Sequence, residues 1–539
     1  MKKLIITLFT LLFAPAVSAA TKQPNVIVLF TDDQGYADLG LHGSQIVKTP
    51  NIDSIGRNGI HFTSGYVAAP QCGPSRAGIL SGRYPQRFGM EINAASAPGF
   101  GMPSDIPLIG NYMKKAGYVT AAVGKWHVGN TNASLAINRG FDWVWSMKGE
   151  KPDELQGVKI DNRHRTPTST HRTNYLTLGA LHFIEKNKAK PFFMYLAYHV
   201  PHAPYISTPN WMDKNKHVAN KDKRVLAGMI SELDDSVGRI LAKLRELKLE
   251  EDTLIFYISD NGAQLAAKYP ATVGSNDPLK GKKGTTYEGG VRVPWLVQWK
   301  GTIPAGQVVD DPVISLDVLP TALAAAGRED LITGKLDGIN LLLFLKKQSA
   351  MPSRKLYFRW RGWFAVREDT WNAVYPAPLF QTPPEKIVPL SEAKLELYDM
   401  SRDKEQRSNI ATQQPERVAK LKQSLVAWNR ELTAPGWIAP RDVSVLNRIY
   451  GKEGMSRYPG LSYKTVAQKR PPKTADGGRS LERLMQLRDL DQDGKLTLKE
   501  YIGNTKGRNV PALTRRFNQR DANKDAKLTL EELKKTKDQ

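Results

Sequence analysis

Between residues 24 and 340, short apolar runs alternate with stretches that have the spacing of amphipathic helices. Short apolar runs bounded by polar turns are typical of buried strands. Their regular alternation with helices is typical of an α/β fold built on a mostly parallel sheet. We therefore expect a mostly parallel central sheet sandwiched between helices.

Four of these runs end in polar residues that a hydrophobic core does not require. The runs cover residues 25–30, 119–123, 191–198 and 253–258. The polar residues that follow them are, in order, Asp32 and Asp33, Lys125 and His127, His199 and His202, and Asp260 and Asn261. Each group alone could be an ordinary turn or loop. If the four strands are parallel neighbours, however, the groups converge on one crevice at the carboxyl ends of the strands, where α/β sheets bind ligands.

The residue types in this crevice suggest a metal and an anion. Carboxylate and amide oxygens suit a hard divalent cation, Ca²⁺ or Mg²⁺. An anion bound to that cation would be surrounded by the positive or proton-carrying side chains of Lys125, Arg76, His127, His202 and, from a glycine-rich loop, Lys283. Together with one potential nucleophile, this set predicts a site for a tetrahedral oxyanion ester.

Cys72 is the candidate nucleophile and the only cysteine among 539 residues, so it cannot form an intrachain disulfide. Pro74 suits the first turn of a helix that continues to Gly82. This places the sulfur beside backbone N–H groups at the positive end of a helix dipole. The alternative is a small buried hydrophobic residue, which is the usual role of a free cysteine.

The N-terminus and the net charge indicate an exported protein with an anionic partner. Lys2 and Lys3, an apolar stretch over 4–13 and the small residues 17–19 predict a signal peptide over residues 1–19. We expect a secreted or periplasmic protein without a membrane span, because no later run is long enough to cross a bilayer. The net charge of +24 favours acidic or sulfated partners. We do not expect nucleic acid among them, since no nucleic-acid-binding module is present.

Six segments together resemble type I sulfatases, the arylsulfatase-like branch of the alkaline-phosphatase superfamily. They are NVIVLFTDDQGYADLG, CGPSRAGILSGRYP, GKWHVG, the HVPHAP region, SDNG and KGTTYEGGVRVP, and the resemblance extends over residues 25–429. It implies an alkaline-phosphatase-like fold and hydrolysis of sulfate esters, with a sulfated small molecule or, as we expect, a sulfated carbohydrate as substrate.

The resemblance also implies that Cys72 is oxidised to formylglycine after synthesis, by a formylglycine-generating or an anaerobic sulfatase-maturing enzyme. Many members have Ser, Thr or Ala after this cysteine, whereas this chain has Gly73. Pro74 and Arg76, which matter to the modifying enzyme, are present. A hydroxyl of the hydrated aldehyde would attack sulfur, and the second hydroxyl would later allow sulfate to leave.

The family's site residues map onto matching positions of this chain. The implied metal ligands, for Ca²⁺ rather than Mg²⁺, are Asp32, Asp33, Cys72, Asp260 and Asn261. The implied catalytic residues are Cys72, Arg76, Lys125, His127, His202 and Lys283. The implied substrate-binding residues are Lys125, His199, His202 and Lys283.

Beyond the catalytic domain, expected over residues 20–345, the pattern changes twice. Residues 346–435 predict a smaller antiparallel subdomain, with strands at 355–360, 363–367 and 395–400 and a helix at 417–432. Residues 436–480 are rich in Pro, Gly, Lys and Arg and predict a linker.

Residues 481–539 predict a helical EF-hand pair that binds Ca²⁺. In the first loop, the ligand positions are Asp489, Asp491, Asp493, Lys495 and Glu500, with Gly494 at the sharp turn. In the second loop they are Asp521, Asn523, Asp525 and Glu532, but Ala526 stands where Gly belongs. We expect the second loop to pair with the first and to bind Ca²⁺ more weakly or not at all.

Three alternatives to an exported sulfatase remain. The first is a phosphate or phosphonate monoester hydrolase of the same superfamily. The second is a non-catalytic, Ca²⁺-dependent binder of sulfated glycans, which would not need the cysteine, the histidines and the lysines together. The third is a hydrolase that uses unmodified Cys72, which is disfavoured because nearby carboxylates would raise the pKa of its thiol.

Overall fold

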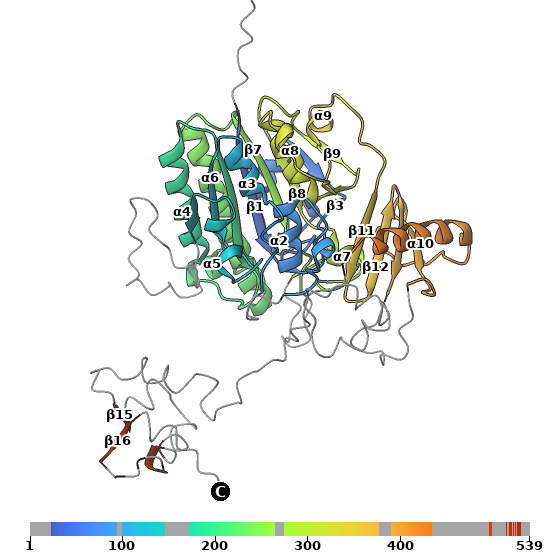
Figure 1. Cartoon of the computed structure of the whole chain (residues 1–539). Helices are drawn as coiled ribbons and strands as arrows, with labels where there is room; N and C mark the ends of the chain where they lie inside the picture. Colours follow the sequence, from blue (N-terminus) through green and yellow to red (C-terminus); the bar gives the residue numbers. More distant parts are fainter. Residues whose placement is uncertain are drawn as a thin grey trace, which may run out of the picture. The chain divides into compact units, whose positions relative to one another are not determined.

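The computed structural model describes residues 23–93, 100–145, 172–264, 274–376 and 390–433, and short pieces between 495 and 529. The chain forms two compact units, Met1–Lys464 and Thr465–Gln539 (Figure 1). The predicted signal peptide and linker lie outside the described residues. No helix of the described part is both long enough and apolar enough to cross a bilayer.

The first unit is built on an eight-stranded sheet with the order β5-β4-β6-β1-β7-β8-β2-β9. The strands are β1 (Asn25–Asp32), β2 (Ile60–Phe62), β4 (Val119–Gly124), β5 (Trp143–Trp145), β6 (Phe192–Pro201), β7 (Thr253–Ser259), β8 (Trp295–Gln298) and β9 (Gln307–Val309). Only β8 runs antiparallel to its neighbours, β7 and β2. The four strands predicted to carry site residues are parallel and adjacent, β4-β6-β1-β7, which confirms the expected mostly parallel sheet.

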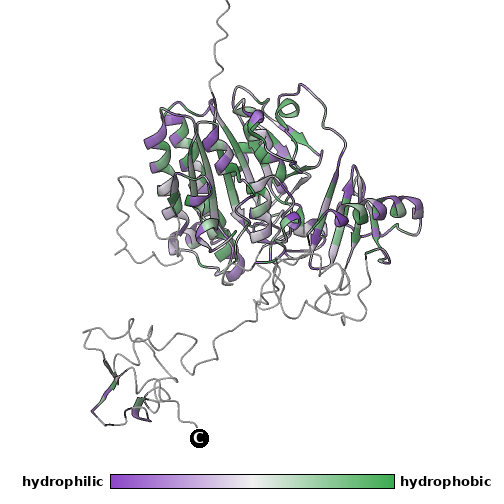
Figure 2. Ribbon diagram, in the orientation of Figure 1, coloured by the Kyte–Doolittle hydropathy of each residue, from purple (hydrophilic) through white to green (hydrophobic). Residues whose placement is uncertain are grey.

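Helices cover both faces of this sheet, because each central strand is apolar on both sides. In β1, Val26, Val28 and Phe30 contribute to one core, whereas Ile27 and Leu29 contribute to the other. The first core contains residues of α2 (Cys72–Ser81), α3 (Ile109–Lys115), α8 (Val318–Ala325) and α9 (Leu342–Leu345). The second contains residues of α1 (Pro50–Arg57), α4 (Arg172–Asn187) and α6 (Lys221–Glu246). Figure 2 shows the apolar strands inside and polar residues on the outer sides of the helices.

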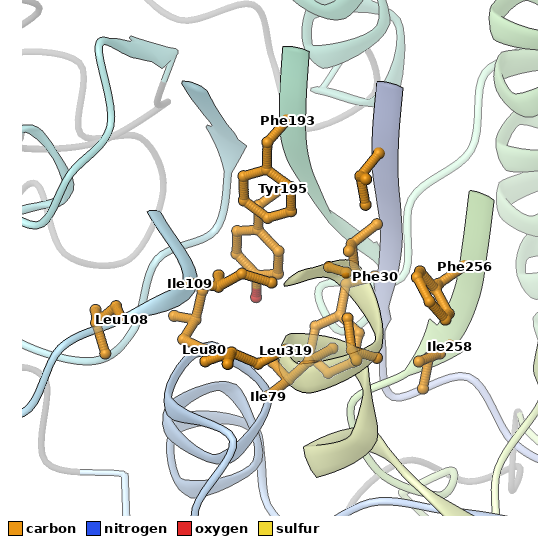
Figure 3. Packing of buried hydrophobic residues seen from close by; sticks show 14 of the residues in the cluster. Phe30, Ile79, Leu80, Leu108, Ile109, Phe193, Tyr195, Phe256, Ile258 and Leu319 are labelled. Carbon is orange, nitrogen blue, oxygen red and sulfur yellow. The ribbon is translucent and has the colours of Figure 1, made fainter. Parts of the chain in front are cut away.

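Helix α2 is anchored in the first core, which fixes the position of Cys72 at its first residue. Ile79 and Leu80 pack with Phe30 of β1 and Leu319 of α8 (Figure 3). Burial of each such side chain contributes about 1.5–3 kcal/mol. The helix ends where Gly82 adopts a left-handed conformation, with φ of 64°, as expected for a glycine after a helix.

A second, antiparallel sheet follows in the chain. It has the order β11-β12-β13-β14 and consists of β11 (Lys355–Trp360), β12 (Trp363–Glu368), β13 (Trp371–Tyr375) and β14 (Glu396–Asp399). Helix α10 (Pro415–Arg430) packs on it through Leu421, Leu425 and Trp428. The antiparallel sheet was predicted, but β13 was not; only a tight turn of two residues, Asp369 and Thr370, separates it from β12.

The remaining elements of the first unit are short. They are β3 (Gly65–Tyr66), β10 (Val313–Ile314), α5 (Pro209–Lys214), α7 (Glu288–Val291), and 3₁₀ turns at Gly40–His42, Pro85–Phe88, Asn132–Ser134, Ala136–Asn138, Ser315–Asp317 and Glu329–Leu331.

In the second unit, β15 (Lys495–Thr497) and β16 (Lys527–Thr529) form an antiparallel pair. Among the predicted EF-hand ligands, Asp489, Asp491, Asp493, Glu500 and Glu532 lie outside the described residues, as does most of the predicted helical sequence.

A buried ionic cluster joins the small sheet to the catalytic core. Glu288 is fully buried and accepts hydrogen bonds from Tyr66 Oη at 2.7 Å, Arg292 Nη1 at 3.1 Å and Asn372 Nδ2 at 2.6 Å. The guanidinium of Arg367, on β12, lies 3.6 Å from the same carboxylate. One carboxylate therefore balances two buried arginines that belong to different parts of the unit.

We predict that Glu288→Gln lowers the free energy of unfolding by about 3 kcal/mol, because it removes the carboxylate that pairs with buried Arg367 and leaves buried Arg292 only the half-exposed Asp310, 3.6 Å away. Denaturant unfolding or thermal inactivation would measure the loss. Glu431→Gln is the matched control: Glu431 pairs with Arg87 but is 53% exposed, so its loss should cost less than about 1 kcal/mol. Equal stability of the two variants would contradict the role assigned to Glu288.

Candidate active site

The predicted polar residues meet at the carboxyl ends of β4, β6, β1 and β7. Backbone hydrogen bonds set their spacing: the Lys125 amide donates to Ala197 O at 2.8 Å, and the Asp260 amide donates to Thr31 O at 3.0 Å. These bonds extend the ladders between neighbouring strands by one residue beyond their ends. The turns that carry the functional side chains are therefore continuous with the rigid sheet.

Asp32, Asp33, Asp260 and Asn261 form a buried group of oxygen ligands, each no more than 3% exposed. Asn261 Nδ2 donates to Asp33 Oδ1 at 2.8 Å, and the Asp33 amide donates to Asp260 Oδ1 at 3.1 Å. Asp33 has a left-handed backbone, with φ of 64°, a strained conformation that is common at functional sites.

Three oxygens of this group are suited to a cation. Asp32 Oδ1, Asp33 Oδ2 and Asn261 Oδ1 are buried and accept no hydrogen bond from the described residues. Buried acceptors are normally satisfied, and a hard divalent cation satisfies carboxylate and amide oxygens. Ligand atoms of Asp32, Asp33, Cys72 and His202 lie within 4.8 Å of one another. The residues present therefore fit a divalent cation.

Asp260 has a different set of contacts from the other predicted ligands. Its Oδ2 accepts hydrogen bonds from Arg76 Nε at 3.1 Å and Nη2 at 2.7 Å, while its Oδ1 accepts the Asp33 amide. Burial, together with the charge of Asp32, raises the pKa of Asp260 to about 6. Its role in this structure is to hold Arg76 and the backbone of the Asp33 turn.

Three basic side chains neutralise the carboxylates and surround Cys72. Lys125 Nζ donates to Asp32 Oδ2 at 2.5 Å, and Lys283 Nζ donates to Asp33 Oδ1 at 2.5 Å. Burial opposes ionisation of Asp32, yet the charges of Lys125, His202 and Arg76 hold its pKa well below the ordinary value. The third, Arg76, is completely buried and also donates to Lys125 O at 3.1 Å.

Cys72 lies at the centre of this arrangement and is fully buried. Its Sγ is 3.1 Å from Lys283 Nζ and 3.9 Å from Asp33 Oδ1. Burial and the carboxylates of Asp32 and Asp260 raise the pKa of the thiol, and this effect exceeds that of the two lysines. An unmodified Cys72 is therefore held as a neutral thiol, which is a poor nucleophile.

The start of α2 differs in one respect from the sequence prediction. The Gly73 amide is not free, since it donates to Asn93 Oδ1 at 2.8 Å. A Cβ at residue 73 would lie 2.9 Å from that same oxygen and 3.1 Å from His127 O. Gly73, at a position where the resemblance gives Ser, Thr or Ala in many members, is thus approached closely by the Asn93 side chain and by the backbone of His127.

The three histidines lie at the rim of the site. His202 Nε2 is 3.7 Å from Asp33 Oδ2, and its side chain is 35% exposed. Burial lowers the pKa values of His127 and His199 to about 3, so both rings are neutral at neutral pH. The buried Nδ1 atoms of these two rings have no hydrogen-bond partner among the described residues. A neutral imidazole has one ring nitrogen that accepts a hydrogen bond, so both rings can take part in polar contacts without adding positive charge.

Sequence reasoning missed several supporting residues. Tyr195 lies in a predicted strand and belongs to no recognisable motif. Its hydroxyl nevertheless accepts a hydrogen bond from Arg76 Nη1 at 3.3 Å. Asn93 follows a 3₁₀ turn without a recognisable motif. Trp360, at the tip of the β11–β12 hairpin, donates from Nε1 to Gln71 Oε1 at 3.1 Å, beside Cys72 in sequence. Only the tertiary fold brings these residues to the site.

Comparisons with known proteins settle the family. The Sulfatase family profile matches residues 24–328. The chain belongs to the sulfatase family. N-acetylgalactosamine-6-sulfatase of Mus musculus is 33% identical over 390 residues, which cover 66% of this chain and 72% of the relative. Steryl-sulfatase of Homo sapiens is 28% identical over 473 residues, which cover 69% and 80%.

A solved structure supports the same assignment. The crystal structure of Ps i-CgsB in complex with k-i-k-neocarrahexaose matches with a TM-score of 0.68 and 31% identity, covering 79% of this chain and 97% of the other. The chain is thus a sulfuric ester hydrolase, as predicted. This favours the sulfatase interpretation over a non-catalytic glycan binder and over the other hydrolases considered from the sequence.

The loop that carries Lys283 is fixed in this sulfatase from three sides. The Lys283 amide donates to Ala263 O at 3.1 Å, and the Gly284 amide donates to Pro70 O at 2.8 Å. The indole of Trp360 lies against Gly284. A Cβ atom added at residue 284 would be only 3.0 Å from Trp360 Cη2. The small sheet therefore helps to hold Lys283 against Cys72.

We predict that Trp360→Ala lowers kcat about 100-fold, because displacement of a catalytic group by about 1 Å can cost that much. Trp360→Phe keeps the ring beside Gly284 and loses only the hydrogen bond to Gln71, so we expect a loss of less than about tenfold. Rates on a small chromogenic sulfate ester would measure both effects.

Trp299→Phe is the matched control. Trp299 is also buried and donates from Nε1 to a carbonyl, Glu251 O at 3.0 Å. Its kcat should stay within about twofold of the unsubstituted enzyme, since the lost hydrogen bond and the altered packing involve no candidate active-site residue. Unchanged kcat in Trp360→Ala would show that Lys283 does not depend on the hairpin.

Proposed function

We propose that this sulfatase hydrolyses sulfate esters of a carbohydrate, with Cys72 converted to formylglycine and Ca²⁺ bound by the acidic group. The observation that carries the proposal is the state of Cys72. Its thiol is buried, has a raised pKa and is contacted by Lys283 at 3.1 Å. A thiol in these surroundings is unsuited to attack, whereas the neighbouring cations Lys125, Lys283 and Arg76 suit an anionic ester.

The metal proposal rests on Asp32, Asp33 and Asn261, whose buried free oxygens would hold the ion, with residue 72 and Asp260 as further candidates. Ca²⁺ is preferred over Mg²⁺ because it accepts irregular sets of oxygen ligands. A bound cation would supply Lewis-acid chemistry, polarising ester oxygens and lowering the pKa of a hydroxyl on residue 72 in its hydrated aldehyde form.

The chain's own residues supply charge and protons. Lys125 and Lys283, each within 2.5 Å of an aspartate oxygen, are placed to bind sulfuryl oxygens and to stabilise their charge in the transition state. His202 is the most exposed of the three histidines and is assigned to protonate the departing alcohol. Neutral His127 is assigned to accept a proton from residue 72. His199 is assigned to bind substrate.

The proposed substrate class is supported by two of the similar proteins. One relative is named for a sulfated amino sugar, and the solved structure of Ps i-CgsB contains a hexaose. A carbohydrate sulfate is therefore the proposed substrate of this chain. We further propose that a formylglycine-generating or anaerobic maturing enzyme modifies Cys72, and that the protein is exported after removal of residues 1–19. Sequencing the N-terminus of the mature protein tests the export proposal.

Cys72→Ala is expected to abolish sulfate release from sulfated mono- and disaccharides and from a chromogenic aryl sulfate, because alanine provides no nucleophile. Thermal unfolding should stay close to that of the unsubstituted protein, since alanine fills most of the buried space. The matching phosphate ester serves as the comparison substrate. Residual activity in Cys72→Ala, or a preference for the phosphate ester, would overturn the proposal.

Removing divalent metal with a chelator is expected to abolish ester hydrolysis, with recovery by Ca²⁺ exceeding that by Mg²⁺, because three buried oxygens would lose their partner. Chelation would also strip an EF-hand, so the Glu500→Gln variant is the control for that effect. This variant should hydrolyse the ester normally. Full activity in excess chelator would contradict the metal proposal.

For the C-terminal unit we propose an EF-hand pair that binds Ca²⁺. Leu496 and Leu528, each the eighth residue of its predicted loop, are paired between β15 and β16. In the second loop, the Ala526 amide donates to Asp521 Oδ2 at 3.0 Å, and the Asp525 amide donates to Asn523 Oδ1 at 3.1 Å. This symmetric pairing and these turns support the proposal.

Ala526 has φ of 62°, the left-handed conformation for which an EF-hand loop uses glycine. That conformation costs a non-glycine residue about 1–2 kcal/mol. Ala526→Gly should therefore tighten Ca²⁺ binding to the full chain by about fivefold or more. Calorimetric titration measures the change. Ala526→Ser, which keeps a Cβ, is the control and should bind Ca²⁺ no more tightly than the unsubstituted chain. Equal Ca²⁺ affinity of Ala526→Gly and the unsubstituted chain would refute the strain argument.

A further inference from the structure

A group of lysines on and beside two helices is not used by the reaction described above. Lys214 ends α5, Lys216 follows it, and Lys221 and Lys223 lie in the first turn of α6. All four side chains are exposed. Residues 211–224 hold five lysines and arginines against two aspartates. We call the four lysines the α5–α6 basic surface.

Chain connectivity places this surface at the catalytic edge of the sheet. Helix α6 connects the end of β6 to the start of β7, two strands that run parallel to β1. Its first turn therefore lies at the carboxyl edge of the sheet, where the site residues are, and its last turn lies at the amino edge. Helix α5 packs on the early part of α6, since Asn215 Nδ2 donates to Ser231 Oγ at 3.0 Å.

The stability of the protein does not explain these charges. None of the four lysines has an ion pair with a carboxylate of the described residues. Lys221 and Lys223 occupy the first turn of a 26-residue helix. This turn carries the positive end of the helix dipole, where acidic side chains are stabilising and lysines are not. Lys214 is held over the ring of Trp211, with Nζ 4.0 Å from the centroid. The lysines thus present uncompensated charge toward solvent.

The chain limits how far this surface can lie from the candidate active site. Trp211 is nine positions after His202, so the two residues are at most about 32 Å apart. Ile206, between them, is 38% exposed and offers an apolar contact for the face of a sugar ring. A small sulfated molecule in the site would not reach the lysines, whereas a longer carbohydrate would.

We propose that the α5–α6 basic surface binds sulfate groups of a polymeric sulfated carbohydrate, away from the ester that is cleaved. The proposal deepens the proposed function and rests on it for the identity of the polymer. Repeated sulfates along one chain match several separate ammonium groups, and the attraction acts over about 8 Å at physiological ionic strength. The surface would retain a polymer while successive esters enter the site.

The test compares two variants with the same change in net charge. The first carries Lys214→Gln, Lys216→Gln, Lys221→Gln and Lys223→Gln. The control carries Lys115→Gln, Lys186→Gln, Lys190→Gln and Lys248→Gln, at exposed lysines that precede β4, β6 and β7 and so lie at the amino edge. These lysines also lack ion pairs with described residues. Neither set contains an active-site residue.

The readouts are elution from immobilised heparin in a salt gradient and hydrolysis of a small chromogenic sulfate ester. We expect the α5–α6 variant to elute at clearly lower salt than both the control and the unsubstituted enzyme. Hydrolysis of the small ester should stay within about twofold in all three proteins, since the site is unchanged. Desulfated heparin should retain none of them.

The two proposals fail in different ways. Elution of both variants at the same salt concentration would overturn the basic-surface proposal, whatever the activity. Absence of ester hydrolysis in the fully matured, unsubstituted enzyme would overturn the proposed function, while a difference in elution would still support a surface for sulfated polymers. Loss of small-ester hydrolysis in the α5–α6 variant alone would contradict a role away from the cleaved ester.

Discussion

The active site depends on a buried pair of opposite charges, Arg76 and Asp260, whose closest atoms are 2.7 Å apart. Neither side chain has any exposed surface. Removing one partner of such a pair typically costs about 3–5 kcal/mol, because the other charge remains buried. The pair joins the first turns of α2 to the end of β7, and Arg76 also reaches the backbone of Lys125 at the end of β4. The position of residue 72 relative to the acidic group follows from it.

The same balance of charge links the small sheet to the candidate active site. Lys283 is the cation nearest to Cys72, and its loop is held by the β11–β12 hairpin as well as by the large sheet. Glu288, five residues later, bridges the two sheets through buried arginines. Docking of the small sheet and placement of Lys283 are therefore coupled, and damage to the hairpin should reduce activity before the fold is lost.

Much of this could be predicted from the sequence. The strands ending in Asp32, Lys125, His199 and Asp260 follow from apolar runs with fixed polar endings, and their convergence follows from the rule for parallel sheets. The contacts of Asn93, Tyr195 and Trp360 could not be predicted, because they join residues far apart in the chain and carry no motif. The bond between the Gly73 amide and Asn93 also could not be foreseen. Strand β13 was missed for a local reason, its two-residue connection to β12.

The central claim is that residue 72 acts as formylglycine rather than as a cysteine. The most direct measurement is mass spectrometry of the peptide that contains residue 72, from protein produced together with its maturing enzyme. The account predicts a mass lower than that of the thiol by the replacement of one sulfur and two hydrogens with one oxygen, or the hydrate of that aldehyde. An unmodified thiol in fully active protein would contradict the account, because this buried, neutral thiol would then have to be the nucleophile itself.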